Sequence, residues 1–218
     1  MSQRQKKVFS LESYLKDGLI SKEKYALLVE HIKKRSNIVI GGETGCGKTT
    51  LMNAIIDKMV EFTPDDRFYI VEDCPELQCS ARNVKFILPT FQKMATKIRM
   101  ARRWPFRRQK RIIVGEIRYG DVTNELLKAW NFGHTGGITT VHANSALTMI
   151  SRIRDLLCEV IPPYDDLPDV SQSVQLLVHM IRKRNDKTIT INEVIETKLV
   201  ESTEAKIKVD GKIKETQL

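Results

Sequence analysis

The sequence predicts an α/β domain built on a mainly parallel sheet with helices on both faces. Several short runs are apolar throughout, which is typical of strands that are buried on both sides. These runs alternate along the chain with segments whose apolar residues recur at helical spacing. A length of 218 residues is sufficient for one main domain with a buried core.

Residues 1–36 are predicted to form a short helical segment ahead of the sheet. Ser10 and Ser21 each precede an amphipathic stretch, and a serine hydroxyl at that position can accept a hydrogen bond from a first-turn amide. Gly18 separates the two stretches because glycine disfavours a helix interior. The apolar face of the second stretch consists of Tyr25, Leu28, Val29 and Ile32.

Residues 37–200 carry the alternating pattern and are predicted to form the domain itself. Five apolar runs are predicted strands, at 37–40, 67–72, 84–88, 111–116 and 137–141. Helices are predicted after the first run, at 90–103, from Asp121 onward, and from Ser145 to the pair Pro162-Pro163. This order indicates a parallel sheet with helical crossovers.

The C-terminal part of the chain is predicted to form β-hairpins. Strands at 175–182 and 187–197 flank the polar turn Asn185-Asp186. The last segment, residues 201–218, is predicted to be a charged tail with a second hairpin at Asp210-Gly211.

Composition points to anionic partners. Lys and Arg number 36 against 27 Asp and Glu, which gives a formal net charge of +9. This charge favours nucleotides, nucleic acid or an acidic lipid surface. No apolar run reaches the ~18 residues that span a bilayer, and the chain starts without an apolar signal segment, so we expect a cytoplasmic protein. The cysteines lack zinc-site spacing and are expected to be reduced thiols: Cys46, Cys74, Cys79 and Cys158.

A glycine-rich motif follows the first predicted strand. Residues 41–50 are GGETGCGKTT and fit the pattern G-x-x-x-x-G-K-[ST]. The glycines let the backbone amides point at phosphates, and the positive end of the next helix favours negative charge. We expect Lys48 to neutralise the β- and γ-oxygens of ATP and Thr49 to ligate Mg²⁺. The predicted nucleotide-binding residues are Gly42, Glu43, Thr44, Gly45, Cys46, Gly47, Lys48, Thr49 and Thr50.

Two glutamates are candidates for the acid that ATP hydrolysis also needs. Glu72 and Glu116 each end a predicted strand, and the carboxyl ends of parallel strands meet at one edge of a sheet. Gly115 stands where many P-loop enzymes carry a metal-binding aspartate, so Glu116 is a predicted metal ligand as well as a catalytic candidate. The residues alone leave open how the two glutamates divide these roles, and the alternative for each is a solvated strand-end acid.

Four ordered motifs resemble the type II/IV secretion ATPase superfamily, in particular the TrbB-like conjugal-transfer ATPases. They are GGETGCGKTT, VEDCPELQ at 71–78, RIIVGEIR at 111–118 and GHTGGITTVHANSA at 133–146. The resemblance implies a RecA-like P-loop ATPase core that forms a homo-oligomeric ring, commonly a hexamer. It also implies a motor for macromolecular transfer that works with membrane-channel proteins of a conjugation or secretion apparatus, in the cytoplasm and peripheral to the inner membrane.

The same resemblance implies roles for two further catalytic candidates. His142 would lie near the γ-phosphate and respond to ATP or ADP, since an imidazole can donate to a phosphate oxygen. The alternative is that His142 caps the helix after Ser145. His134 lies in the same motif and has the weaker case. Arg102, like Arg99, would donate to phosphates at a subunit boundary as an arginine finger does.

Arg102 belongs to a basic stretch, residues 97–111, which holds eight Lys and Arg and no acid. Trp104 and Phe106 lie within it, so the alternatives to arginine donors are a nucleic-acid interface or a solvated face. Two rival functions therefore stay open. One is a DNA-dependent RecA-like ATPase. The other is a nucleotide-binding assembly module without turnover, because similar proteins carry a longer N-terminal domain than residues 1–36.

Overall fold

The strands form two groups in the computed structural model, which describes residues 9–103, 110–162, 167–183 and 188–198. The first group has the order β5-β1-β6-β7 and consists of β5 (Ile138–Val141), β1 (Ile38–Gly41), β6 (Leu176–Arg182) and β7 (Ile189–Glu196). The second has the order β3-β2-β4 and consists of β3 (Asn83–Ile87), β2 (Arg67–Val71) and β4 (Lys110–Val114).

All neighbouring strands within these groups are parallel except β6 and β7. The two groups meet just beyond β4, where the Ile117 amide donates to the Thr140 carbonyl at 2.9 Å. The Thr140 hydroxyl also donates to the Gly115 carbonyl at 2.9 Å. The predicted mainly parallel sheet is confirmed, and the carboxyl ends of β1, β2, β4 and β5 lie along one edge.

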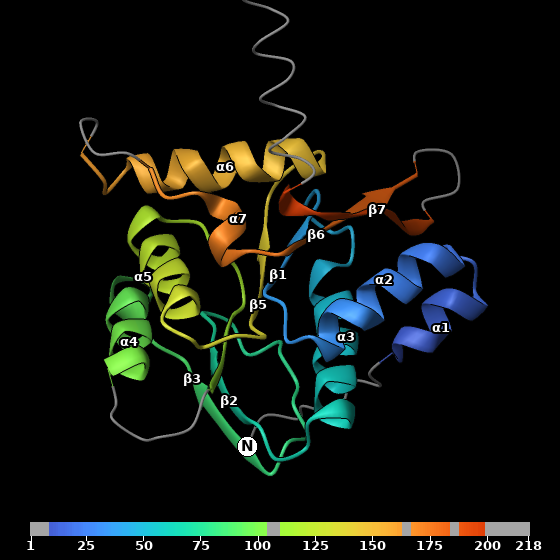
Figure 1. Cartoon of the computed structure of the whole chain (residues 1–218), viewed down its shortest axis with the longest axis horizontal. Coiled ribbons are helices and arrows are strands. Elements are labelled where there is room, and N and C mark those ends of the chain that lie inside the picture. The colour runs from blue at the N-terminus through green and yellow to red at the C-terminus, as the bar shows by residue number, and fades with distance from the viewer. Residues whose placement is uncertain (1–8, 104–109, 163–166, 184–187, 199–218) are drawn as a thin grey trace, which may run out of the picture.

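Helices cover both faces of the strands, as the sequence predicted (Figure 1). One face carries α1 (Leu11–Lys16), α2 (Lys22–Lys33) and α3 (Lys48–Phe62). The other carries α4 (Phe91–Arg103), α5 (Gly120–Asn131), α6 (Ala146–Cys158) and the short α7 (Val170–Ser173). Ile38 and Ile40 of β1 pack with the first group of helices and Val39 with the second, because side chains alternate along a strand.

The N-terminal helices begin at the predicted caps. The Ser10 hydroxyl accepts from the Ser13 amide and the Ser21 hydroxyl from the Lys24 amide, each at 3.3 Å. Leu28 and the other apolar residues of α1 and α2 are buried in the same core as α3. The packing of α1 and α2 against α3 therefore helps to position α3, the helix that follows the glycine-rich motif.

Two predicted helix limits on the other face are wrong. Helix α5 begins at Gly120 rather than Asp121, because the Glu159 carboxylate accepts from the Gly120 amide at 2.7 Å and replaces a local cap. Helix α6 ends at Cys158, ahead of Pro162, where the chain turns at Glu159.

The C-terminal region contains the predicted antiparallel pair, β6 with β7. The turn at Asn185-Asp186 and the second hairpin predicted at Asp210-Gly211 lie outside the described residues. The sequence did not predict α7, which Asp169 caps by accepting from the Ser171 amide at 2.8 Å. In the described part of the chain, no helix has the length and hydropathy to cross a bilayer.

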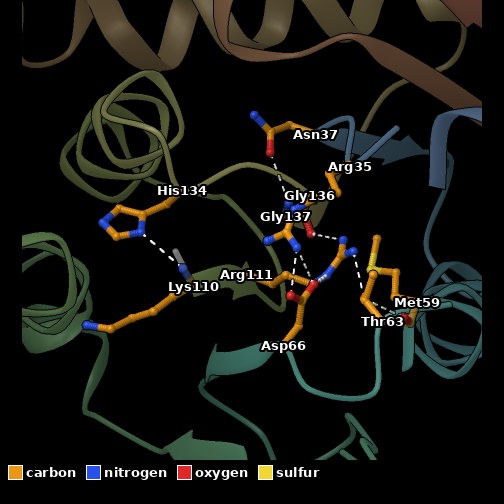
Figure 2. A network of polar contacts seen from close by, with 10 residues as sticks. All are labelled: Arg35, Asn37, Met59, Thr63, Asp66, Lys110, Arg111, His134, Gly136 and Gly137. Atoms are coloured by element: carbon orange, nitrogen blue, oxygen red, sulfur yellow. Dashed lines mark hydrogen bonds and ion pairs between the residues drawn. The ribbon is translucent and has the colours of Figure 1, made fainter. Parts of the chain in front are cut away.

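A polar network connects the amino ends of the strands, at the edge of the sheet opposite the P-loop (Figure 2). Arg111 is fully buried there, and its Nε donates to the Asp66 carboxylate at 2.7 Å. Its remaining donors reach the Gly136 carbonyl at 3.0 Å and the Thr63 hydroxyl at 2.9 Å. Arg35 donates to the same Asp66 carboxylate at 2.6 Å. One carboxylate thus balances two guanidinium groups.

This network corrects the interpretation of the basic stretch at residues 97–111. Lys110 is buried like Arg111, and its Nζ donates to the Ala101 carbonyl at 2.9 Å. Neither residue belongs to a solvated face or can contact nucleic-acid phosphates. Arg107 and Arg108 lie outside the described residues.

We predict that Asp66→Ala lowers the free energy of unfolding by about 3 kcal/mol, because it leaves the Arg111 guanidinium buried without its counter-charge. Chemical denaturation of the purified variant measures this loss. Glu30→Ala is the control, since Glu30 forms an exposed ion pair with Lys34 and should change stability little.

The loss of stability in Asp66→Ala should also depend on pH. Burial acts to raise the pKa of Asp66, but hydrogen bonds from Arg35, Thr63 and Arg111 outweigh it and hold that pKa below its usual value. A lowered pKa in the folded state gives stability that is present above the unfolded pKa of ~3.9 and is lost as the pH falls further. The difference between wild type and Asp66→Ala should shrink from pH 6 to pH 3. An unchanged difference would contradict the charge pairing.

Candidate functional site

The phosphate-binding motif forms a curled loop between β1 and α3. Gly42 lies at φ 154°, and a Cβ there would come within 2.5 Å of the Cys46 sulfur and 2.7 Å of the Met180 carbonyl oxygen. Gly47 adopts the left-handed region at φ 84° and stands directly before α3. Among the described residues no side chain caps this helix start, so its first amides are available to a ligand in the loop.

Lys48 lies in the centre of the loop. Its Nζ donates to the Gly42 carbonyl at 2.8 Å and to the Glu43 carbonyl at 2.9 Å, and the side chain is buried. None of the described carboxylates forms an ion pair with it. A buried ammonium group held only by carbonyl dipoles attracts an anion strongly, because the local dielectric constant is low.

Glu72 is buried directly after β2. Its Oε2 accepts from the amides of Glu76 and Leu77 at 3.0 and 2.9 Å, which fixes the carboxylate in one orientation. A Cβ at Gly115 would lie 3.2 Å from the Cβ of Glu72. Glycine at position 115 therefore leaves room for Glu72 where many P-loop enzymes carry an aspartate.

Glu116 is the centre of a chain of polar side chains. His142 Nε2 lies 2.9 Å from Glu116 Oε1, and Arg118 Nε donates to Glu116 Oε2 at 2.6 Å. Arg118 Nη1 also donates to Asp73 Oδ2 at 3.4 Å. The hydrogen bond with Glu116 raises the pKa of Arg118. Sequence reasoning did not select Arg118 or Asp73, although they stand within two residues of Glu116 and Glu72.

These groups surround one cleft of about 550 Å³, a volume typical of small-molecule sites. Its wall from the phosphate-binding motif consists of Thr44, Gly45, Gly47, Lys48, Thr49 and Thr50. The other lining residues are Ile189, which packs on Gly47, and Glu72, Asp73, Cys74, Glu76, Leu77, Gly115, Glu116, Arg118, Thr140 and His142. The cleft therefore brings predicted phosphate ligands within reach of both predicted acids and the predicted histidine.

Three predicted nucleotide-binding residues are not among those that line this cleft. Cys46 is buried, and its sulfur lies 2.5 Å from where a Cβ on Gly42 would stand. Glu43 contributes its carbonyl to Lys48 and lines a neighbouring hollow of about 570 Å³. That hollow lies over α6 and shares Thr44 and His142 with the cleft.

Three other candidates, Arg102, Arg99 and His134, are not among the residues that line the cleft of their own chain. Arg102 and Arg99 both pair with Glu125, at 3.3 and 3.0 Å. The role of Arg102 at a subunit boundary stays a prediction. His134 accepts from the Lys110 amide at 3.4 Å, at the amino end of β4 and hence at the opposite edge of the sheet.

The alternative that His142 caps α6 is wrong. Ser145 is the N-cap, and its hydroxyl accepts from the Thr148 amide at 3.1 Å. The Thr148 hydroxyl accepts from the Ser145 amide at 2.9 Å, which completes a capping box. His142 is half exposed at the cleft instead.

Comparison with known proteins gives consistent matches. The family model described as "Type II/IV secretion system protein" matches residues 2–215. The conjugal transfer protein TrbB of Rhizobium radiobacter is 38% identical over 193 residues, which cover 88% of this chain and 58% of that protein. The type IV secretion system protein VirB11 of Bartonella quintana is 30% identical and covers 68% of this chain and 42% of that protein.

Solved structures show the same fold. The VirB11 ATPase from the Brucella suis type IV secretion system, in complex with sulphate, superimposes with a TM-score of 0.67 at 26% identity. The match covers 91% of this chain and 59% of that one. The pilus retraction motor PilT with bound ADP matches with a TM-score of 0.64 at 18% identity and supports the fold alone. The chain spans about half the length of the curated relatives that it matches.

We predict that a bound nucleotide slows alkylation of Cys74, because this exposed thiol lines the cleft. Cys158 is exposed at the end of α6, outside the residues that line the cleft, and is the internal control. Burial raises the pKa of Cys46 and raises that of Cys79 to about 11, so both should react slowly at neutral pH. Mass spectrometry after iodoacetamide treatment, with and without Mg-ATP, measures each rate. Equal protection of Cys74 and Cys158 would argue against binding in the cleft.

Proposed function

Because the chain belongs to the type II/IV secretion system protein family, we propose that it binds and hydrolyses ATP to drive macromolecular transfer in a conjugation or type IV secretion apparatus. The main support for this proposal is that Lys48, Thr49, Glu72, Glu116 and His142 line the same cleft. Residues 37–200 would form the ATPase domain.

The phosphate-binding role follows from the electrostatics of the loop. Lys48 would turn from the carbonyls of Gly42 and Glu43 to the β- and γ-oxygens, which are far better acceptors because they are charged. The first amides of α3 would donate to the same phosphates. A triphosphate thus supplies acceptors for donors that point into the cleft.

The oxygen atoms of side chains that line the cleft also suit Mg²⁺ as ligands. The Thr49 hydroxyl and the carboxylates of Glu72 and Glu116 are hard oxygen ligands, and Mg²⁺ in nucleotide sites commonly takes one or two carboxylates besides phosphate and water. The bound ion would supply charge neutralisation of the phosphate oxygens. We propose Thr49 and Glu116 as its ligands.

Glu116 is the proposed general base. Its carboxylate is oriented by Arg118 on one oxygen and faces His142 on the other. A base held in this way is already oriented to accept the proton of an attacking water. His142, which lies between Glu116 and the hollow over α6, would donate to the γ-phosphate and respond to its loss.

We propose that the working form is a ring, with six copies as the expected number. The open hollow beside the cleft is a surface that a neighbouring copy would cover. Arg102 or Arg99 of that copy would leave Glu125 and donate to phosphate. The ring would lie in the cytoplasm against the inner membrane and act on channel proteins.

We predict that Lys48→Ala weakens Mg-ATP binding by about 10²-fold, roughly 2.7 kcal/mol, because a charge-assisted contact to phosphate is lost. Isothermal titration calorimetry measures the affinity directly. Lys34→Ala is the control, because Lys34 is an exposed lysine that pairs only with Glu30 within the described residues. Unchanged affinity in Lys48→Ala would contradict the proposed phosphate site.

We predict that Glu116→Gln lowers the turnover of ATP by 10²–10⁴-fold, as loss of a general base does. Binding of ATP without Mg²⁺ should stay within a few-fold of wild type, because Glu116 is a proposed ligand of the ion and not of the phosphates. Phosphate release under saturating Mg-ATP measures turnover. If wild type binds Mg-ATP but shows no turnover, the chain is an assembly module and not a motor. Stimulation of turnover by DNA would instead favour a DNA-dependent ATPase.

A further inference from the structure

Strands β6 and β7 both contact the phosphate-binding loop. The Met180 carbonyl lies 2.7 Å from where a Cβ on Gly42 would stand. The Ile189 side chain lies 3.4 Å from the corresponding point on Gly47 and lines the cleft. A shift of the β6–β7 hairpin would therefore displace the loop, because the two are in direct contact.

The same hairpin is also tied to the start of α6, through Glu193 of β7. The Glu193 carboxylate accepts from the Ala146 amide at 2.9 Å. His179 of β6 is buried, and its Nδ1 lies 3.2 Å from the same carboxylate oxygen. His179 pairs with Gly41, the last residue of β1 before the loop. Glu193 thus joins the hairpin, the base of the loop and α6.

The chain between β5 and α6 is anchored at both of its ends. Thr140 fixes one end by donating its hydroxyl to the Gly115 carbonyl at 2.9 Å. The Ala146 contact with Glu193 fixes the other. His142 lies between these anchors, so its distance from Glu116 depends on both of them.

Glu193 is not needed for α6 to form. The capping box of Ser145 and Thr148 already satisfies the Thr148 amide in the first turn and the amide of the N-cap residue Ser145. The apolar face of α6 is also buried independently, with Met149 packed against Gly41 and Ile153 in the core. The carboxylate therefore decides where the helix begins relative to the hairpin, and not whether the helix exists.

We propose that Glu193 is a positioning residue for His142, which transmits the position of the β6–β7 hairpin through the start of α6 to the phosphate end of the cleft. The inference rests on the proposed ATPase function and extends it. Glu193 acts through His142 and does not touch the nucleotide itself.

The test compares Glu193→Ala with Glu193→Gln. The alanine variant should lower kcat for ATP about tenfold, with the Kd of Mg-ATP changed less than about twofold, because displaced catalytic groups cost turnover and not binding. The glutamine variant keeps an acceptor oxygen for the Ala146 amide and should restore kcat. Glu196→Ala is the matched control, since Glu196 lies on the same strand but contacts His31.

A double substitution shows whether Glu193 acts through His142. The kcat of His142→Ala combined with Glu193→Ala should equal that of His142→Ala alone, because the intermediary is already missing. Multiplied losses would overturn the proposal, as would a wild-type kcat in Glu193→Ala.

Hydrogen exchange separates this proposal from the ATPase function. Exchange of the amides at 142–148 should be faster in Glu193→Ala than in wild type and in Glu193→Gln, even without nucleotide. If wild type does not bind or hydrolyse Mg-ATP, the proposed function fails. If exchange at 142–148 is the same in all three proteins, the positioning role fails, whatever the ATPase activity.

Discussion

Parallel strand pairing determines where the functional segments of this chain lie. It sends the carboxyl ends of β1, β2, β4 and β5 to the same edge, although the segments that follow them are far apart in sequence. Each strand therefore delivers one functional segment to the cleft: the phosphate-binding loop, Glu72, Glu116 and His142. The cleft forms as a consequence of topology, and only small adjustments, such as glycine at 115, are needed to fit its side chains together.

The edge of the sheet at the amino ends of the strands has a structural role instead. There, partly exposed Asp66 and Arg35 and fully buried Arg111 form ion pairs between the segments that lead into the strands. A buried ion pair adds little net stability over apolar packing, but a wrong register would leave these charges unpaired. We interpret the network as a device that specifies strand register, which in turn keeps the functional edge aligned.

The sequence predicted most of this because its strongest signals are local. Fully apolar runs and helical spacing predicted the strands and helices, and the glycine pattern predicted the loop around Lys48. The sequence did not predict contacts between distant segments. These are the hydrogen bonds of Glu159 with the Gly120 amide at the start of α5, of Asp66 with the buried Arg111, and of Glu193 with the Ala146 amide. The basic stretch was misinterpreted in part for the same reason, since charge in a sequence does not reveal a buried partner.

A crystal structure with Mg²⁺ and a non-hydrolysable ATP analogue would show whether the cleft binds a triphosphate. We expect phosphate density between Lys48 and Glu116, with Lys48 Nζ moved from the carbonyls of Gly42 and Glu43 to the phosphate oxygens. An analogue bound elsewhere, or a loop that keeps Lys48 on those carbonyls beside an empty cleft at saturating ligand, would contradict this expectation.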